Sequence, residues 1–363
     1  MDKGQKKDIQ YPRIYTIHSQ KGGAGKTSIA IAIAGFAAIF HNKNALIIDA
    51  DLTGTSLLDV LESPGKEQSP YFNELILAKP DQFAKYTPIT SRELKKRIHT
   101  NMAHFYQKEP NYDKISYMPS SPHFDDILKI VPLISQEDYL HFFWHRLEDI
   151  IVTATMDQFE VIIIDHPPGL FGISTASLNM VLDQFTWDLS NEKDMPALTR
   201  LGKLYRAVSN ESIDKSIVAH AYLITTPDPS DYRALLPSFS LLLGKNRKIE
   251  IFKKQDVKID LILNKAMETS KARFDPAMAL NEIFKNVANF QDGRKVEPAL
   301  IESLRARAKE VGALACGYVP NFAMASILPT IQSLKHKRGK EKEYLGMKGW
   351  CIQVGKSAGL YQD

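Results

Sequence analysis

Apolar runs rich in β-branched residues recur along the chain and are separated by longer stretches with helical spacing. The runs span residues 13–19, 45–50, 114–120, 161–166, 218–226, 257–265 and 313–320. Short, continuous apolar runs are typical of strands buried on both faces. Their alternation with helix-length connections predicts an α/β fold: a doubly wound, mostly parallel sheet with helices on both faces. Candidate chemistry is expected at the carboxyl ends of the strands, where such sheets bind ligands.

Two connections are too long for a minimal α/β unit. Residues 60–112 are polar with several prolines, and residues 184–215 contain WDLSNEKDMPALTR. We interpret both as insertions on one domain that spans residues 1–334, because neither an internal repeat nor a Gly/Ser-rich linker marks a second domain. Residues 335–363 form the best candidate for a loosely attached tail.

Composition narrows the class of protein. The 363 residues are 44% hydrophobic and 24% charged, which is typical of a globular protein. We find neither an apolar stretch of transmembrane length nor an apolar core behind the charged first residues, so we expect a cytoplasmic protein without a membrane partner. Two cysteines without metal-ligand spacing, Cys316 and Cys351, argue against a disulfide framework, an iron–sulfur cluster or structural zinc.

Positive charge is concentrated in two segments. Residues 335–348 hold six Lys/Arg against two Glu, a surplus of four that equals the formal net charge of +4. A second basic cluster lies in residues 245–258. Both segments are candidates for contacts with nucleic acid phosphates, and a solvated helix end is the alternative for the second. The basic side chains of the second cluster are those of Lys245, Arg247, Lys248, Lys253, Lys254 and Lys258.

The strongest motif is SQKGGAGKTS, residues 19–28, which lies directly between an expected strand and an expected helix. Glycines allow the backbone N–H groups and the positive end of the following helix to approach a polyphosphate. Lys26 would then place its charge on the β and γ phosphates, and the Thr27 hydroxyl would bind Mg²⁺. The sequence therefore predicts a site for ATP and Mg²⁺. Its nucleotide-binding residues are Gly22, Gly23, Ala24, Gly25, Lys26, Thr27 and Ser28.

The phosphate loop departs from the ordinary pattern, because Gln20 stands where glycine is usual and Lys21 begins a KGGxGKT string. This string resembles the deviant Walker A box of the ParA/MinD superfamily of P-loop ATPases. In that family the additional lysine reaches across a dimer interface to the phosphates of the partner. The resemblance implies this catalytic role for Lys21, beside Lys26, in a homodimer that forms in the ATP state.

Two carboxylate boxes follow in the family's order. ALIIDADLTGTSL places Asp49 and Asp51 at a strand end and resembles the switch I segment, which implies that Asp51 positions the attacking water or a metal-bound water. FEVIIIDHPPG resembles the Walker B and switch II segments, which implies that Asp165 bonds the hydration shell of Mg²⁺. Capping of a turn is the alternative for both Asp49 and Asp51. His166 is interpreted as a packing residue.

The base-binding residues are expected later in the chain. LILNKA resembles the segment whose asparagine binds adenine, which implies that role for Asn264. GYVPNF resembles a second base-proximal loop and implies a contact from Pro320, although Asn321 stands where the family has an acidic residue. His141 and His145 lie four residues apart, and we favour packing over a metal pair because no third ligand is evident.

These motifs predict an ATP-driven switch with slow hydrolysis. What the ATP-bound dimer binds would determine its biological function, and three hypotheses remain open. The first alternative is a ParA-like partition or positioning ATPase that binds DNA through the two basic segments. The second is a regulatory or assembly ATPase whose insertions bind a protein, for instance in a mobile-element or defence complex. The third is an enzyme of the related amide-ligase branch. A tyrosine kinase is disfavoured, because Tyr344 and Tyr361 do not form a tyrosine cluster.

Overall fold

The structure is a computed structural model. It describes residues 12–53, 71–77, 89–100, 111–134, 136–169, 172–174, 177, 218–226, 231, 234, 257–266, 316–320, 351–352 and 354–355. The expected insertion at 184–215 and the basic run at 335–348 lie outside these residues, as do Asn321 and all of the second basic cluster except residues 257–258.

The described strands form one sheet of eight strands in the order β3-β4-β2-β5-β1-β6-β7-β8. All neighbouring strands are parallel except β3 and β4, which pair antiparallel. The mostly parallel sheet confirms the prediction. Seven of its strands begin and end within a few residues of the predicted bounds, and β3 was not predicted. The strands are β1 (Arg13–His18), β2 (Ala45–Asp49), β3 (His99–Thr100), β4 (Ile115–Met118), β5 (Val161–Asp165), β6 (Val218–Thr225), β7 (Val257–Ala266) and β8 (Cys316–Pro320).

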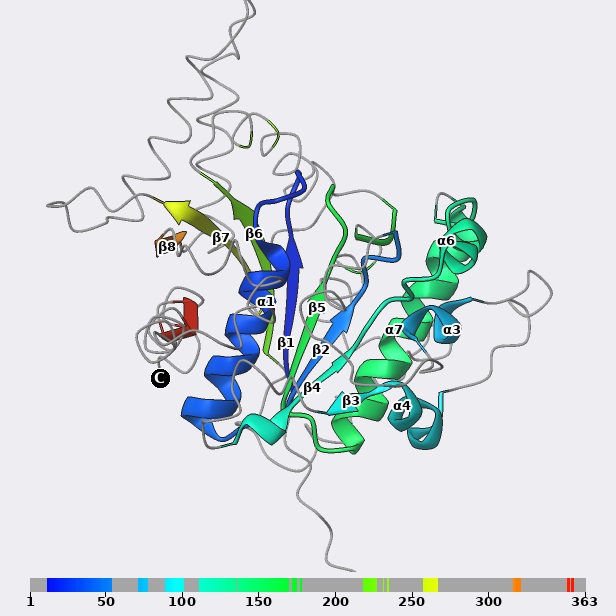
Figure 1. Ribbon diagram of the computed structural model, residues 1–363, viewed down its shortest axis with the longest axis horizontal. Helices are drawn as coiled ribbons and strands as arrows, with labels where there is room; N and C mark the ends of the chain where they lie inside the picture. Colours follow the sequence, from blue (N-terminus) through cyan, green and yellow to red (C-terminus); the bar gives the residue numbers. More distant parts are fainter. Residues whose placement is uncertain are drawn as a thin grey trace, which may run out of the picture.

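Helices cover both faces of the sheet, as the sequence predicts. Figure 1 shows α1 on one face and α7, with α3 and α4 beside it, on the other. Helices α3 and α4 and strand β3 belong to the expected insertion at 60–112, so this part of the insertion extends the sheet and covers α7. The described helices are α1 (Lys26–Gly35), the π-helix η1 (Phe36–Phe40), α3 (Phe72–Ile76), α4 (Ser91–Arg97), the short η3 (Tyr112–Lys114), α6 (Phe124–Ile130) and α7 (Glu137–Met156).

Helix α1 is the centre of a hydrophobic core cluster. Every residue from Ile29 to Gly35 is buried, which is typical of a helix that is covered on all sides. Cys351 and Val354 are buried in the same cluster of side chains. A Cβ at Gly355 would lie 2.3 Å from the ring of Phe36, so the backbone approaches η1 closely there. The expectation of a loosely attached tail is therefore wrong for these residues, while the domain boundary at 334 stays a prediction.

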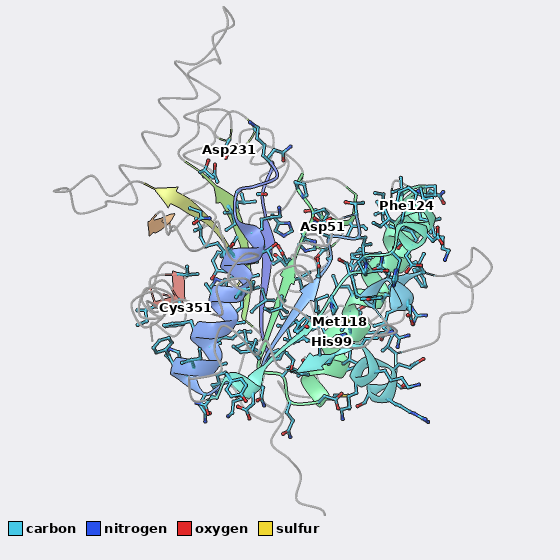
Figure 2. The ribbon with its side chains drawn as sticks, in the orientation of Figure 1. Asp51, His99, Met118, Phe124, Asp231 and Cys351 are labelled. Atoms are coloured by element: carbon cyan, nitrogen blue, oxygen red, sulfur yellow. The ribbon has the colours of Figure 1, made fainter. Side chains whose placement is uncertain are left out.

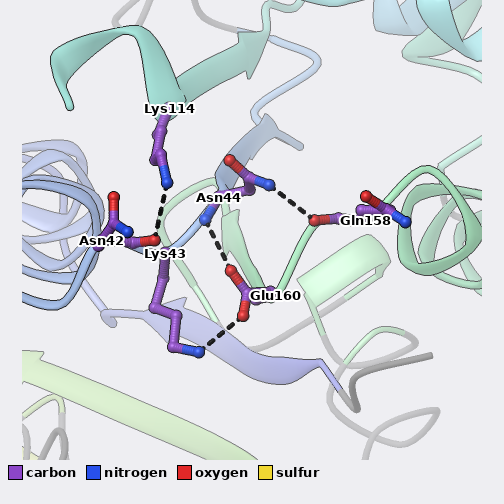
Figure 3. Close-up of polar contacts among 6 residues, drawn as sticks. All are labelled: Asn42, Lys43, Asn44, Lys114, Gln158 and Glu160. Atoms are coloured by element: carbon purple, nitrogen blue, oxygen red, sulfur yellow. Dashed lines mark hydrogen bonds and ion pairs between the residues drawn. The ribbon is translucent and has the colours of Figure 1, made fainter. Parts of the chain in front are cut away.

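A polar network fixes the amino ends of β2 and β5, opposite the phosphate loop (Figure 3). The Glu160 carboxylate accepts hydrogen bonds from Lys43 Nζ at 2.7 Å and from the Asn44 backbone N–H at 3.2 Å. Asn44 Nδ2 donates to the carbonyl of Gln158 at 3.1 Å. Because this network joins the turns that precede both strands, it fixes their register, which places Asp49 beside Asp165 at the other end.

Candidate nucleotide site

The phosphate loop connects β1 to α1 at the carboxyl edge of the sheet. Gly25 is the N-cap of α1 with φ +90°, a left-handed conformation that glycine adopts at no steric cost, and no side chain caps the helix. A Cβ at Gly22 or Gly23 would meet no atom of the described structure within 4 Å, so one side of the loop is open. A helix leaves its first N–H groups without intrahelical acceptors, so the open loop and the start of α1 can bind an anion.

The two lysines of the loop lie in different environments. Lys26 is only 8% exposed, and its charge acts on Asp165 and His18 beneath the loop. The Lys21 side chain is 41% exposed and lies 3.6 Å from Asp231, which follows β6. No sequence pattern indicated Asp231 as the partner of Lys21. Lys26 is thus directed into the site, and Lys21 lies at its surface.

Two carboxylates lie side by side beneath the loop. Asp49 and Asp165 are paired in the register of β2 and β5, and both are buried. Thr27 Oγ1 donates a hydrogen bond to Asp165 Oδ2 at 2.5 Å, which connects the first turn of α1 to the end of β5. The Ser120 hydroxyl donates to Asp49 Oδ2 at 2.9 Å, a contact that sequence reasoning missed.

Asp51 lies at the edge of this group and is partly exposed. Its backbone N–H donates to Asp49 Oδ1 at 3.1 Å. Its own Oδ1 accepts from the hydroxyl of Thr53 at 3.0 Å. Figure 2 shows Asp51 and Asp231 at the same end of the sheet. Asp49 is therefore a buried structural acceptor, and Asp51 is the carboxylate that solvent can reach.

The electrostatics of the pair favour a positive ligand. Burial raises the pKa of Asp49 well above its usual value, and the neighbouring Asp165 and Asp51 raise it further. Burial also raises the pKa of Asp165 to about 6, against the lowering effects of the Lys26 ammonium and the Thr27 hydroxyl. Asp165 Oδ1 is buried and has no hydrogen-bond partner among the described residues. A hydrated Mg²⁺ ion would supply both the missing charge and the missing donor, so the residues fit this ion.

The adenine-binding residues of the sequence prediction are only partly described. Asn264 is 3% exposed at the end of β7, and its Nδ2 donates to the Ala24 carbonyl of the phosphate loop at 2.8 Å. Pro320 ends β8 and pairs in register with Ala266. Both residues therefore lie at the carboxyl edge of the sheet, as expected. Their contact with a base stays a prediction.

Two buried histidines support the loop from below. His18 and His166 stack with their ring centroids 4.4 Å apart and their planes 8° apart, which agrees with a packing role for His166. The His18 ring shares a hydrogen bond of 2.8 Å with the Ser174 hydroxyl. Burial lowers the pKa of His18 to about 3 and that of His166 well below its usual value, so both rings are neutral.

The candidate metal pair in α7 is only partly described. His145 is half exposed on its side chain and lies 3.6 Å from Glu148, and the side chain of His141 lies outside the described residues. The described residues contain no group of three or more potential metal ligands among His, Cys, Asp and Glu. None of the described helices is long and apolar enough to cross a bilayer.

The fold and the site together define a P-loop nucleotide-binding protein, because a glycine-rich loop joins a central strand to a helix above two strand-end carboxylates. A family model described as the CobQ/CobB/MinD/ParA nucleotide binding domain matches residues 15–337. The chain belongs to this family, which confirms the resemblance inferred from the motifs.

Solved structures with low sequence identity also resemble the chain. The cell division ATPase MinD of Pyrococcus furiosus is 17% identical with a TM-score of 0.44, and the match covers 95% of this chain and 98% of that one. A McdA–ATP complex from Cyanothece is 14% identical with a TM-score of 0.49, over 98% and 99%. A putative plasmid partition protein of Borrelia burgdorferi bound to AMPPNP is 15% identical with a TM-score of 0.45, over 94% and 99%. No curated protein sequence matches the chain.

Proposed function

We propose that the chain is an ATP-binding and ATP-hydrolysing molecular switch. The observation that carries the proposal is the bond from Thr27 to Asp165, which joins the phosphate loop to a buried carboxylate whose second oxygen is unpartnered. When bound, ATP and Mg²⁺ would supply the scissile phosphoanhydride bond and the counter-charge. Lys26 and the N–H groups of the loop would hold the β and γ phosphates.

Asp51 is the candidate that orients the attacking water. It is the carboxylate of the group that solvent reaches, and its bonds to Asp49 and Thr53 fix its position. Asp165, fixed by Thr27, would accept hydrogen bonds from metal-bound waters.

The working state in this proposal is a homodimer that encloses ATP between two copies. Lys21 supports it, because its ammonium is exposed at the surface of the site while Lys26 already serves the loop from inside. Each copy would contribute Lys21 to the phosphates of the other. The dimer would then bind DNA through the basic segments at 245–258 and 335–348. A protein partner at the insertions is the alternative, with a regulatory or assembly role.

The first experiment measures molecular mass by light scattering for the wild type and Lys21→Ala, with ADP and with a non-hydrolysable ATP analogue. We expect the wild type to double in mass only with the analogue and Lys21→Ala to stay monomeric. Lys43→Ala is the matched control, because Lys43 pairs with Glu160 at the opposite end of the sheet. A mass that ignores nucleotide in the wild type would overturn the dimer.

Adding nonspecific duplex DNA in a second run distinguishes the DNA-binding function from its alternatives. A further gain in mass in the ATP-analogue state alone supports the DNA-binding function. Unchanged mass favours the protein-partner alternative. Rapid ATP turnover with a small-molecule carboxylate, without any dimer, would instead indicate the amide-ligase alternative.

A further inference from the structure

A side chain from β7 reaches into the backbone of the phosphate loop. Asn264 Nδ2 donates a hydrogen bond of 2.8 Å to the carbonyl of Ala24, a residue 240 positions earlier in the chain. Asn264 is 3% exposed and Ala24 is 2% exposed, so the bond is shielded from water. A buried hydrogen bond of this kind is costly to lose, because its acceptor cannot turn to solvent instead.

The contact also depends on the glycine that follows. A Cβ at Gly25 would lie 2.3 Å from Asn264 Nδ2, so the amide occupies the space that any other residue at position 25 would need. Gly25 has φ +90° and begins α1. The left-handed turn of the loop and the asparagine amide therefore fit each other closely.

The geometry of the peptide bond transmits this contact to the anion-binding side of the loop. A trans peptide unit is planar, and its C=O and N–H point in opposite directions. The Ala24 carbonyl and the Gly25 N–H belong to one such unit. When Asn264 holds the carbonyl toward β7, the Gly25 N–H is directed away from β7, where it can join the other N–H groups of the loop.

We propose that Asn264 is a positioning residue that holds the phosphate loop in its anion-binding conformation. This inference rests on the proposed nucleotide binding at the loop and goes beyond the expected contact with adenine. A side-chain amide has two N–H donors and one carbonyl acceptor. Among the described residues one donor is used, on Ala24, which leaves one donor and the acceptor for a base edge. The same residue can thus couple recognition of the base to the shape of the loop that binds the phosphates.

Inorganic tripolyphosphate is the probe that isolates this role, because it carries phosphates without a base. The experiment measures the affinities of Mg-tripolyphosphate and Mg-ATP calorimetrically for the wild type and Asn264→Ala. Loss of one buried hydrogen bond predicts a fall of about tenfold in both affinities. A tripolyphosphate affinity within twofold of the wild type, with a weaker ATP affinity, would show that Asn264 reads only the base and would overturn the proposal.

Two further variants keep the test independent of folding. Asn264→Asp preserves the volume but cannot donate to Ala24, so we expect it to lose at least as much tripolyphosphate affinity as Asn264→Ala. Asn73→Ala is the matched control, because Asn73 is also a fully buried asparagine whose Oδ1 accepts from the Ser121 N–H at 2.7 Å, away from the loop. It should lower the melting temperature and leave both affinities unchanged.

The result is distinguishable from failure of the proposed function. A wild type that binds neither probe would contradict nucleotide binding itself. A wild type that binds both probes but stays monomeric would contradict the dimer and leave the role of Asn264 standing. If Asn73→Ala reduces tripolyphosphate affinity as much as Asn264→Ala does, general loss of stability explains both, and the positioning role is wrong.

Discussion

The carboxylates on the two sides of the phosphate loop differ in how far the chain itself supplies their partners. On the side of β2 and β5, Asp49 and Asp165 are buried at 0% and 1% exposure, and one oxygen of Asp165 has no partner among the described residues. On the side of β6 and β7, Asp231 pairs with Lys21 and accepts a hydrogen bond from Thr226. The first side holds a buried carboxylate with an unpartnered oxygen, whereas the described carboxylate of the second side, Asp231, is paired within the chain. The difference predicts that a bound cation would act on the ends of β2 and β5 rather than on those of β6 and β7.

The largest effect is expected from Asp165→Asn, which removes the buried charge and keeps an acceptor for Thr27. Mg-dependent ATP turnover should fall by about 10–100-fold, since the residue supports the metal through its waters. The apoprotein should become more stable at pH 8, by on the order of 2 kcal/mol. The reason is that a carboxyl whose pKa rises from 3.8 to about 6 on folding costs stability once the pH exceeds that range.

Urea unfolding without Mg²⁺, at pH 5 and pH 8, checks the stability of Asp165→Asn, and steady-state turnover checks its activity. If the variant is less stable than the wild type at pH 8, the buried carboxylate is already compensated within the chain. The contrast between the two sides of the loop would then be wrong.

A smaller effect on the free energy of unfolding is expected when the pH is lowered, because of the buried ring of His18. Its pKa is about 3 in the folded protein and ordinarily 6.5, so protons bind preferentially to the unfolded chain. Stability should therefore fall as the pH drops below about 6.5, by up to about 1.4 kcal/mol per pH unit from this group. His18→Phe keeps a ring against His166 and removes the proton-binding site. Between pH 7.5 and 5, the free energy of unfolding should change less with pH for this variant than for the wild type. An equal pH dependence would refute the assignment of this effect to His18.

The smallest effect is expected from Asp231→Asn, on the side of β6 and β7. The ion pair with Lys21 is partly exposed, with side chains 41% and 15% accessible, so it is worth no more than about 1 kcal/mol. Releasing Lys21 should lower the ATP concentration needed for dimerisation by up to about fivefold. Light scattering across an ATP-analogue titration measures this shift. A rise in the required concentration would mean that Asp231 orients Lys21 for dimerisation instead of holding it back from the partner's phosphates.

The sequence was sufficient for the parts of the site that depend on local pattern. Asp165 follows a continuous apolar run and Lys26 follows the glycines, so a strand end and a phosphate loop could be located directly. Asp231 and Asn264 could not be assigned to their partners, because these contacts depend on the register of β6 and β7 beside β1. The burial of Cys351 could not be predicted either, because a short segment next to glycine shows no helical periodicity.

The packing of Cys351 and Val354 against the core around α1 also has a consequence for biosynthesis. The phosphate loop and α1 leave the ribosome early, but the cluster that buries them is complete only after Val354 has been synthesised. Until then, apolar residues of α1 and η1 lack part of their cover, which is the condition under which nascent chains bind chaperones or aggregate. Closure of this core is therefore expected only after residues 351–354 have been synthesised, later than every described strand.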